Sequence, residues 1–281
     1  SATTGATGDQ VSYRGFFRYT SDRYGLEGFR QKVGKAFNPE VGYVQRSDIE
    51  RTDVIARFSP RLRSTPGLRK IGGTVEMDRF VNSRGIEETR VSTADFRIDF
   101  DSSDAFTATA RQDREFLQVP FRIARGVVIP VGQYDFLDAM LRYTIGPQRM
   151  ASGQVTLTSG AFYSGHRQQI DYSGRIKVTN QLGFEPRVLL GRITLPQGNF
   201  TTRLTGVRTI YTITPRMFLS GLLQYNSSLS TVETNVRWRW EYQPGSDLFV
   251  VYTDGRDTTP IRGTSLLNRG IAIKVTRLLR F

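Results

Sequence analysis

The sequence predicts an all-β fold, a transmembrane antiparallel up-and-down β-barrel of about 14 strands. Three observations favour it: a two-residue repeat of apolar and polar side chains, the lack of long helical patterns, and connections that alternate between short and long. From Val236 to Tyr242 the chain reads Val-Arg-Trp-Arg-Trp-Glu-Tyr, in which every second residue is apolar and each residue between is charged. This period is typical of a strand with one apolar and one polar face.

The same repeat recurs along the chain. Val11, Tyr13, Phe17 and Tyr19 alternate with polar residues near the start, and Ile271, Ile273 and Val275 do so near the end. Alternating runs between turn residues predict strands at 10–20, 50–63, 68–81, 86–100, 104–117, 133–145, 150–163, 167–180, 186–195, 200–213, 216–227, 231–243, 247–254 and 268–281. Residues 1–9, rich in Thr, Gly, Ala and Ser, predict a flexible N-terminal tether, and 10–281 then form the barrel as one domain.

The connections fall into two sets. Short turns are expected at 64–67, 101–104, 146–148, near Pro186, and at 214–215 and 244–246. Longer loops are expected at 21–49, 118–132 and 255–267, interleaved with shorter ones at 82–85, 164–166, 196–199 and 228–230. All the long loops then lie at one end of the strands, which is typical of outer-membrane barrels. An even number of strands places both termini at the other end.

A soluble β-sandwich is the alternative, because it would also alternate. Its strands average about 5–6 residues, whereas a tilted membrane strand needs roughly 9–11, which fits the runs better. No apolar run approaches the roughly 18 residues of a membrane helix. The chain has no Cys and one His, which excludes disulfides, thiolate zinc sites and metal sites built mainly from imidazoles.

Two segments resemble a known family. They are Trp-Arg-Trp-Glu-Tyr-Gln-Pro-Gly-Ser-Asp-Leu-Phe-Val-Val-Tyr-Thr-Asp-Gly-Arg-Asp at 238–257 and Phe-Asn-Pro-Glu-Val-Gly-Tyr-Val-Gln-Arg-Ser-Asp at 37–48. They resemble an uncharacterised family of Gram-negative outer-membrane proteins, in which a carbohydrate-binding-like domain precedes a C-terminal β-barrel of unknown function. The resemblance implies a barrel in the bacterial outer membrane and no particular reaction. Phe281, which ends an alternating strand, resembles the signal that the barrel-assembly machinery reads.

Charge places the polar face inside the barrel. An Arg or Lys facing lipid at mid-membrane costs about 2–4 kcal/mol, so charged strand residues are expected to line the lumen. The basic candidates are Arg14, Arg18, Arg57, Arg97, Arg111, Arg142, Arg175, Lys177, Arg192, Arg208, Arg237, Arg239 and Lys274. The structural alternative is that they pair with acidic residues on neighbouring strands. The acidic residues expected on the same face are fewer, so the sequence predicts a net positive lumen that, if water fills it, favours anions. They are Glu76, Asp78, Asp95, Asp113, Asp138, Asp171 and Glu241.

The favoured function is a passive, porin-like channel with a basic lumen, without enzymatic activity or a cofactor. The alternative is a closed anchoring barrel that scaffolds a partner or the upstream domain. Expected partners are outer-membrane lipid and lipopolysaccharide, the assembly machinery, and a protein at the long loops. The net charge of +13 also suggests nucleic acid, but the aromatic residues fall on the face opposite the arginines, where they cannot act together.

Two groups of residues and one loop are further candidates. Ser164, His166 and Asp171 could form a catalytic group at the rim, although Ser and His two residues apart on a turn rarely align. Asp254 and Asp257 could bind Ca²⁺ or bridge lipopolysaccharide. The segment 118–132 is too apolar for an exposed loop. It is expected to fold into the barrel mouth or pack on a partner, with Arg122 or Arg125 reaching lumen carboxylates.

Overall fold

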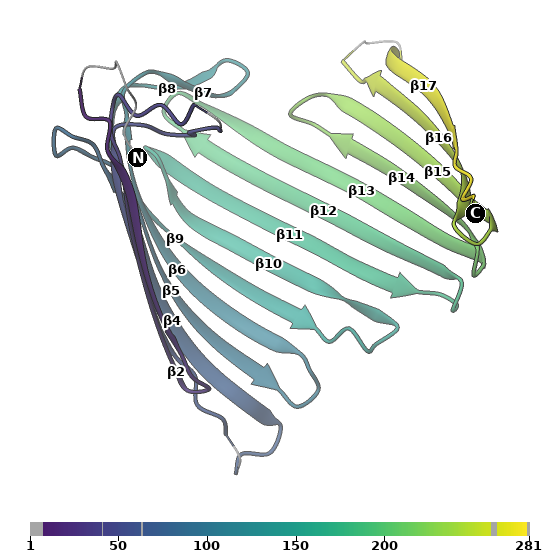
Figure 1. Ribbon diagram of the computed structural model, residues 1–281, viewed down its shortest axis with the longest axis horizontal. Coiled ribbons are helices and arrows are strands. Elements are labelled where there is room, and N and C mark those ends of the chain that lie inside the picture. Colours follow the sequence, from purple (N-terminus) through teal and green to yellow (C-terminus); the bar gives the residue numbers. More distant parts are fainter. Residues whose placement is uncertain (1–7, 41, 63, 260–262, 280–281) are drawn as a thin grey trace. The chain divides into compact units, whose positions relative to one another are not determined.

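The computed structural model describes residues 8–40, 42–62, 64–259 and 263–279. Its main element is one antiparallel sheet of 15 strands, in which each strand pairs with its neighbours in chain order, apart from a separate two-stranded hairpin (Figure 1). The sheet strands are β1 (Ser12–Thr20), β2 (Tyr24–Val33), β3 (Ile49–Phe58), β4 (Leu68–Val81), β5 (Glu87–Phe100), β6 (Ala105–Leu117), β9 (Gly132–Ile145), β10 (Ala151–Phe162), β11 (Gly165–Lys177), β12 (Leu182–Leu195), β13 (Gly198–Thr214), β14 (Met217–Asn226), β15 (Thr231–Gln243), β16 (Ser246–Asp257) and β17 (Ser265–Val275). The hairpin consists of β7 (Phe121–Ala124) and β8 (Val127–Ile129).

The all-β, antiparallel prediction is confirmed, and no helix occurs among the described residues. Closure of the sheet into a barrel is not confirmed, because β1 and β17 are the two edges of the sheet and do not pair with each other. The single sheet also differs from a sandwich, which needs two sheets packed face to face. No described helix is long and apolar enough to cross a membrane.

The chain divides into two compact units. The N-terminal unit comprises 1–142, 158–168 and 193–199, and the C-terminal unit comprises 143–157, 169–192 and 200–281. Successive connections alternate between the two ends of the strands because the sheet is a meander. We call one end the turn end, with connections 21–23, 59–67, 101–104, 146–150, 178–181, 215–216 and 244–245. The other is the loop end, with connections 34–48, 82–86, 118–131, 163–164, 196–197, 227–230 and 258–264.

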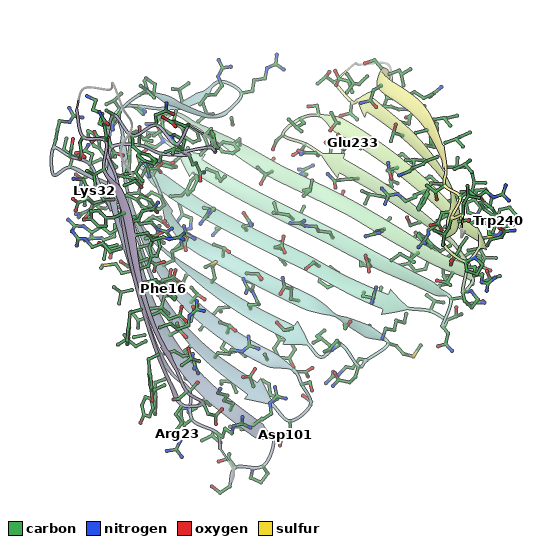
Figure 2. All side chains as sticks on the ribbon, viewed as in Figure 1. Phe16, Arg23, Lys32, Asp101, Glu233 and Trp240 are labelled. Atoms are coloured by element: carbon green, nitrogen blue, oxygen red, sulfur yellow. The ribbon has the colours of Figure 1, made fainter. Side chains whose placement is uncertain are left out.

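The long loops share one end, as expected, but several predicted boundaries are wrong; the strand expected at 50–63, for example, ends at Phe58. Residues 24–33 form β2 and are not part of a loop. The sequence pattern does not reveal this strand, because Arg30 and Lys32 interrupt its apolar face. The structure accommodates both side chains in ion pairs, Arg30 with Glu50 and Lys32 with Asp9. The odd number of strands puts the start of β1 at the loop end, so the termini of the sheet do not share an end. In Figure 2, Lys32 marks the loop end, and Arg23 and Asp101 mark the turn end, of the N-terminal unit.

The expected turn at Pro186 is also wrong. The chain turns at 178–181, where Thr179 Oγ1 accepts hydrogen bonds from the backbone N–H groups of Gln181 and Leu182. Pro186 lies within β12. β17 ends at Val275 instead of continuing to 281, and Phe281, the expected assembly signal, lies outside the described residues.

Few apolar side chains are buried, and most of them lie near the loop end. They are Val33, Ile49, Ala105, Val127, Ile129, Phe136, Ile193 and Leu195. By contrast, many large apolar side chains along the strands are exposed, including Phe17 at 58%, Val75 at 60% and Ile273 at 67%. Among the described residues, the strands therefore enclose few buried apolar side chains and expose many.

Candidate functional site on the polar face

Strand register defines two faces of the sheet, since paired residues share a face. In the N-terminal unit one face carries Arg57, Thr74, Asp95 and Thr109 side by side across β3–β6. In the C-terminal unit one face carries Leu222, Asn235 and Thr253 across β14–β16, with Arg237 and Arg239 on the same side of β15. We call these the polar faces. The opposite, apolar faces carry residues such as Val54, Val75 and Ala94, and Trp238, Val250 and Ile273.

Most arginines on the polar face of the N-terminal unit are paired. Arg51 donates to both carboxylate oxygens of Asp78, at 2.8 and 3.0 Å. Arg97 pairs with Asp99 and Arg111 with Asp113, two residues along the same strand, each at 2.8 Å. Arg18 pairs with Glu27 on the neighbouring strand at 2.9 Å. This part of the polar face therefore consists largely of satisfied ion pairs.

A hollow of about 530 Å³ lies on this polar face toward the turn end. Its lining includes four cations, Arg57, Lys70, Arg97 and Arg142, together with Thr74, Thr93, Thr107 and Thr109. Arg142 interacts with other parts of the chain, and the Arg57 guanidinium is held by the turn below it. Arg57 and Arg97 are therefore held by groups of the sheet and its turn.

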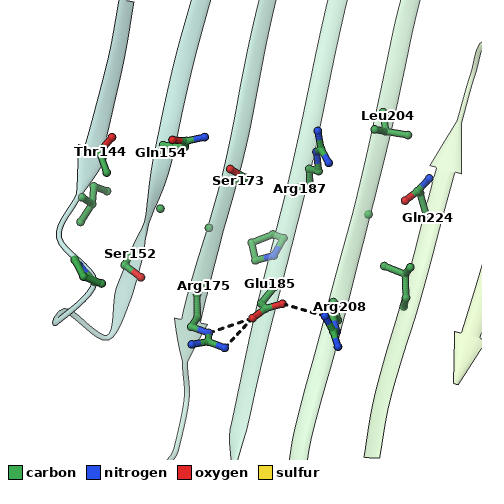
Figure 3. A pocket seen from close by; sticks show the side chains of 17 residues that line it. Thr144, Ser152, Gln154, Ser173, Arg175, Glu185, Arg187, Leu204, Arg208 and Gln224 are labelled. Atoms are coloured by element: carbon green, nitrogen blue, oxygen red, sulfur yellow. Dashed lines mark hydrogen bonds and ion pairs between the residues drawn. The ribbon is translucent and has the colours of Figure 1, made fainter. Parts of the chain in front are cut away.

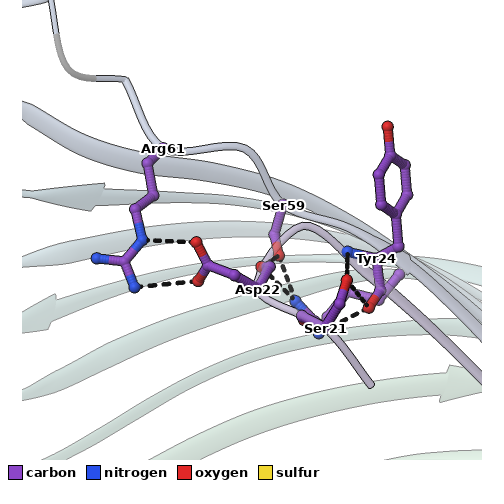
Figure 4. Close-up of polar contacts among 6 residues, drawn as sticks. Ser21, Asp22, Tyr24, Ser59 and Arg61 are labelled. Carbon is purple, nitrogen blue, oxygen red and sulfur yellow. Dashed lines mark hydrogen bonds and ion pairs between the residues drawn. The ribbon is translucent and has the colours of Figure 1, made fainter. Parts of the chain in front are cut away.

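That turn is built from polar contacts between 21–24 and 57–61 (Figure 4). Arg57 donates to the Ser21 carbonyl at 2.8 Å and to Ser59 Oγ. Arg61 forms a two-pronged ion pair with Asp22, at 2.8 and 3.0 Å. The hydrogen bond from Arg61 lowers the pKa of Asp22 below its ordinary value. Two connections at the turn end are therefore tied together.

The second hollow belongs to the C-terminal unit and has a volume of about 770 Å³ (Figure 3). Arg175 of β11 and Arg208 of β13 flank Glu185 of β12, at 2.9 and 4.0 Å. Arg187 also lines the hollow, and its side chain makes no hydrogen bond or ion pair with any described residue. Three cations and one carboxylate therefore share one cavity.

At the loop end of the N-terminal unit, two segments cover apolar residues. The connection 34–48 packs on β2–β4, where Val33 and Ile49 are buried and Arg46 lies 5.1 Å over the Phe80 ring. The β7–β8 hairpin buries Val127 and Ile129, and its Phe121 ring lies 6.4 Å from Tyr163. The β7–β8 hairpin thus folds back on the sheet within this unit, whereas its place in a barrel mouth or against a partner stays a prediction.

The aromatic cluster beside the hairpin contains polar groups. Tyr163 O–H donates to Glu115 at 2.7 Å, and burial together with this carboxylate raises the pKa of Tyr163. Asp138 is fully buried and pairs with Arg167, which also lies over the Phe162 ring at 4.8 Å. Arg122 and Arg125 are exposed and contact no described carboxylate, so the expectation that they reach one is wrong.

The structure distributes the other predicted lumen residues in three ways. Arg239 is held by Asp247 at 2.8 and 3.2 Å. Arg14, Lys177, Arg237 and Lys274 have no partner among the described residues. Arg192 lies on the apolar face, because Gly191 before it faces Gln169 and Thr202 on the polar face.

The other candidates are not assembled as expected. His166 lies 3.4 Å from Ser159 Oγ, whereas Ser164 Oγ bonds Gln197. Asp171 and His166 are five residues apart on β11, and because successive strand residues alternate between faces, they lie on opposite faces of the sheet. Asp254 is engaged by Arg256 and Arg269, and Asp257 accepts hydrogen bonds from Thr259.

Sequence reasoning missed Arg187. The residue follows the supposed turn at Pro186 and so appeared to begin a strand instead of lying within one. The alternation Glu185, Arg187, Leu189 could have identified it, had the turn been assigned to 178–181.

No family model matches the chain, and no curated protein matches it. The resemblance to an outer-membrane family therefore rests on the two segments at 37–48 and 238–257 alone.

Proposed function

We propose that the sheet closes into a barrel in a bacterial outer membrane and acts as a passive channel whose polar face favours anions. The observation that supports it best is the exposed apolar face. Residues such as Phe17, Val75, Leu137 and Ile273 stand outward with no element covering them in the described chain. Hydrocarbon is the environment in which such a face is stable.

The apolar face also has the height of a membrane. On β15 it runs from Val232 to Trp240, about 27 Å along a strand at ~3.4 Å per residue. With a tilt of about 40° this gives roughly 20 Å across the bilayer, close to the ~25 Å apolar band of known barrels.

The two ends of the apolar face differ as the ends of a membrane barrel do. Aromatic rings gather at the turn end: Tyr24 and Phe58 lie 5.3 Å apart, and Trp238 and Trp240 lie 6.2 Å apart. Such belts lie at membrane interfaces. At the loop end the same face carries ion pairs, which we call the ion-pair belt: Arg30–Glu50, Arg79–Glu87, Arg114–Asp135 and the cluster of Asp254 with Arg256 and Arg269. Charged lipopolysaccharide headgroups suit this level.

Closure follows from the same environment. The edge strands β1 and β17 each present unpaired backbone groups, and each such group costs several kcal/mol in hydrocarbon. Pairing β1 with β17 removes both edges, as every membrane barrel must.

The preference for anions rests on the C-terminal unit. Its polar face has four cations without a partner among the described residues, Lys177, Arg187, Arg237 and Lys274, against two such carboxylates, Asp171 and Glu233. A water-filled passage along this face would hold a positive potential.

The anchoring barrel is the second candidate, and the covered loop end favours it. The connection 34–48 and the β7–β8 hairpin both pack on the sheet in the N-terminal unit. If they close the lumen, the exposed outer surface of the hairpin, with Arg122, Arg125 and Val128, is available to a protein partner.

Planar bilayers distinguish the two. The purified protein should give stepwise conductance and, in a salt gradient, a reversal potential that indicates anion preference. Insertion without conductance would favour the anchor. A protein that stays monodisperse without detergent would contradict both proposals.

A further inference from the structure

The larger hollow has the form of a binding site. Its lining residues come from five adjacent strands and the end of β9. Gly206 lies between Leu204 and Arg208 on the polar face of β13. Because it has no side chain, it leaves space above the sheet that the flanking residues enclose.

The charges in this hollow do not balance. Glu185 accepts a hydrogen bond from Arg175 at 3.1 Å, but Arg208 approaches the same carboxylate only to 4.0 Å. Arg187 has no partner in the described chain (Figure 3). The guanidinium group of Arg187 therefore has all its N–H donors available to a ligand, and that of Arg208 has most of them. With three arginines and one glutamate, the cavity has an excess of two positive charges.

The remaining lining narrows the ligand class. Gln154, Gln224, Ser152, Ser173 and Thr144 supply neutral hydrogen-bonding groups. None of the described residues that line the hollow is aromatic, so a sugar ring would find no face to stack on among them. Guanidinium forks match carboxylates in two-pronged geometry.

We propose that this hollow binds a small organic dianion with two carboxylates, one on Arg187 and the other on Arg208. A dianion cancels the excess charge, and the amides and hydroxyls suit its polar substituents. The proposal deepens the channel function, because it assigns a solute class to the passage on which it rests.

Binding of succinate to the detergent-solubilised protein, followed by NMR or calorimetric titration, tests it without a membrane. Succinate should bind, and succinamide, its neutral analogue, should bind at least about tenfold more weakly, because charge-assisted hydrogen bonds are the stronger ones. Equal binding of the two, or no succinate binding, would overturn the proposal.

Variants locate the site. Arg187→Gln should weaken succinate binding about tenfold, and Arg187→Lys should retain part of it. Arg192→Gln is the matched control, since Arg192 lies on the same strand, without a partner in the described chain, on the opposite face. An equal loss in Arg192→Gln would refute the site. Conductance without succinate binding would contradict the solute class alone, whereas binding without conductance would contradict the channel alone.

Discussion

Replacing Ile129 with Ala should release the β7–β8 hairpin from the sheet. The Ile129 side chain is fully buried, whereas that of Val128 beside it is 41% exposed. The substitution removes three buried carbons at about 0.8 kcal/mol each, or about 2.4 kcal/mol in total. Since each ~1.4 kcal/mol is a factor of ten, the released population should rise about fiftyfold.

Limited trypsin digestion reads out this population. Arg122 and Arg125 are exposed within a tight hairpin whose turn contains Gly126 at φ 79°, so cleavage there requires the hairpin to open. When reclosing is fast, the rate of cleavage follows the open population. Cleavage after Arg122 or Arg125 should therefore accelerate about fiftyfold in Ile129→Ala, and little in the control Val128→Ala. Equal rates in wild type and Ile129→Ala would refute the reasoning that this side chain holds the hairpin down.

Three further outcomes are expected. Arg237→Gln should lower the anion-to-cation permeability ratio measured from reversal potentials, and an unchanged ratio would contradict the role of Arg237 in anion preference. Arg239→Gln should mainly lower the unfolding temperature, because Arg239 is in an ion pair with Asp247. Arg61→Gln should return the pKa of Asp22 toward 3.8 in an NMR titration, because the hydrogen bond from Arg61 is what lowers it; an unmoved pKa would show that Arg61 is not the cause. In the wild type this ion pair stabilises the fold above the unfolded-state pKa of Asp22, and the stabilisation is lost as pH falls through the lowered folded-state pKa. Gly160→Ala should destabilise the sheet by about 1–3 kcal/mol in a thermal or denaturant melt, because its Cβ would lie 2.3 Å from the Asp138 Cα; wild-type stability would mean that the strands yield there.

The strands with strict alternation could be predicted closely from the sequence. The predicted boundaries 68–81 and 231–243 match β4 and β15. In these strands one face is apolar over most of its length, from Ile71 to Met77 in β4 and from Val236 to Tyr242 in β15, so local pattern and sheet environment agree. The position of the long loops could be predicted for the same reason, since it depends only on the order of the strands.

The sequence pattern could not predict elements that break the repeat. In β2, Arg30 is on the apolar face and depends on Glu50 of the next strand, a contact that no local pattern contains. Pro186 favours a turn in the sequence, because Pro cannot donate to a sheet ladder and is uncommon inside central strands, yet it lies within β12.

The candidate site was only partly predictable. Arg175 and Arg208 were expected on the polar face, and they flank Glu185 there. Arg187 was missed because of the misplaced turn, and its lack of a partner could be recognised only from the structure.

Accessibility of paired spin labels tests the central claim most directly, that one face of the sheet contacts lipid and the other contacts water. The chain has no Cys, so single cysteines can be introduced at Thr74 and Val75, and at Ala272 and Ile273, which are adjacent residues on opposite faces. After reconstitution into lipid vesicles, labels at 75 and 273 should be accessible to oxygen dissolved in the bilayer and shielded from a water-soluble nickel chelate. Labels at 74 and 272 should show the reverse. Equal access of the chelate to both members of each pair would contradict the proposal that the apolar face lies in the membrane.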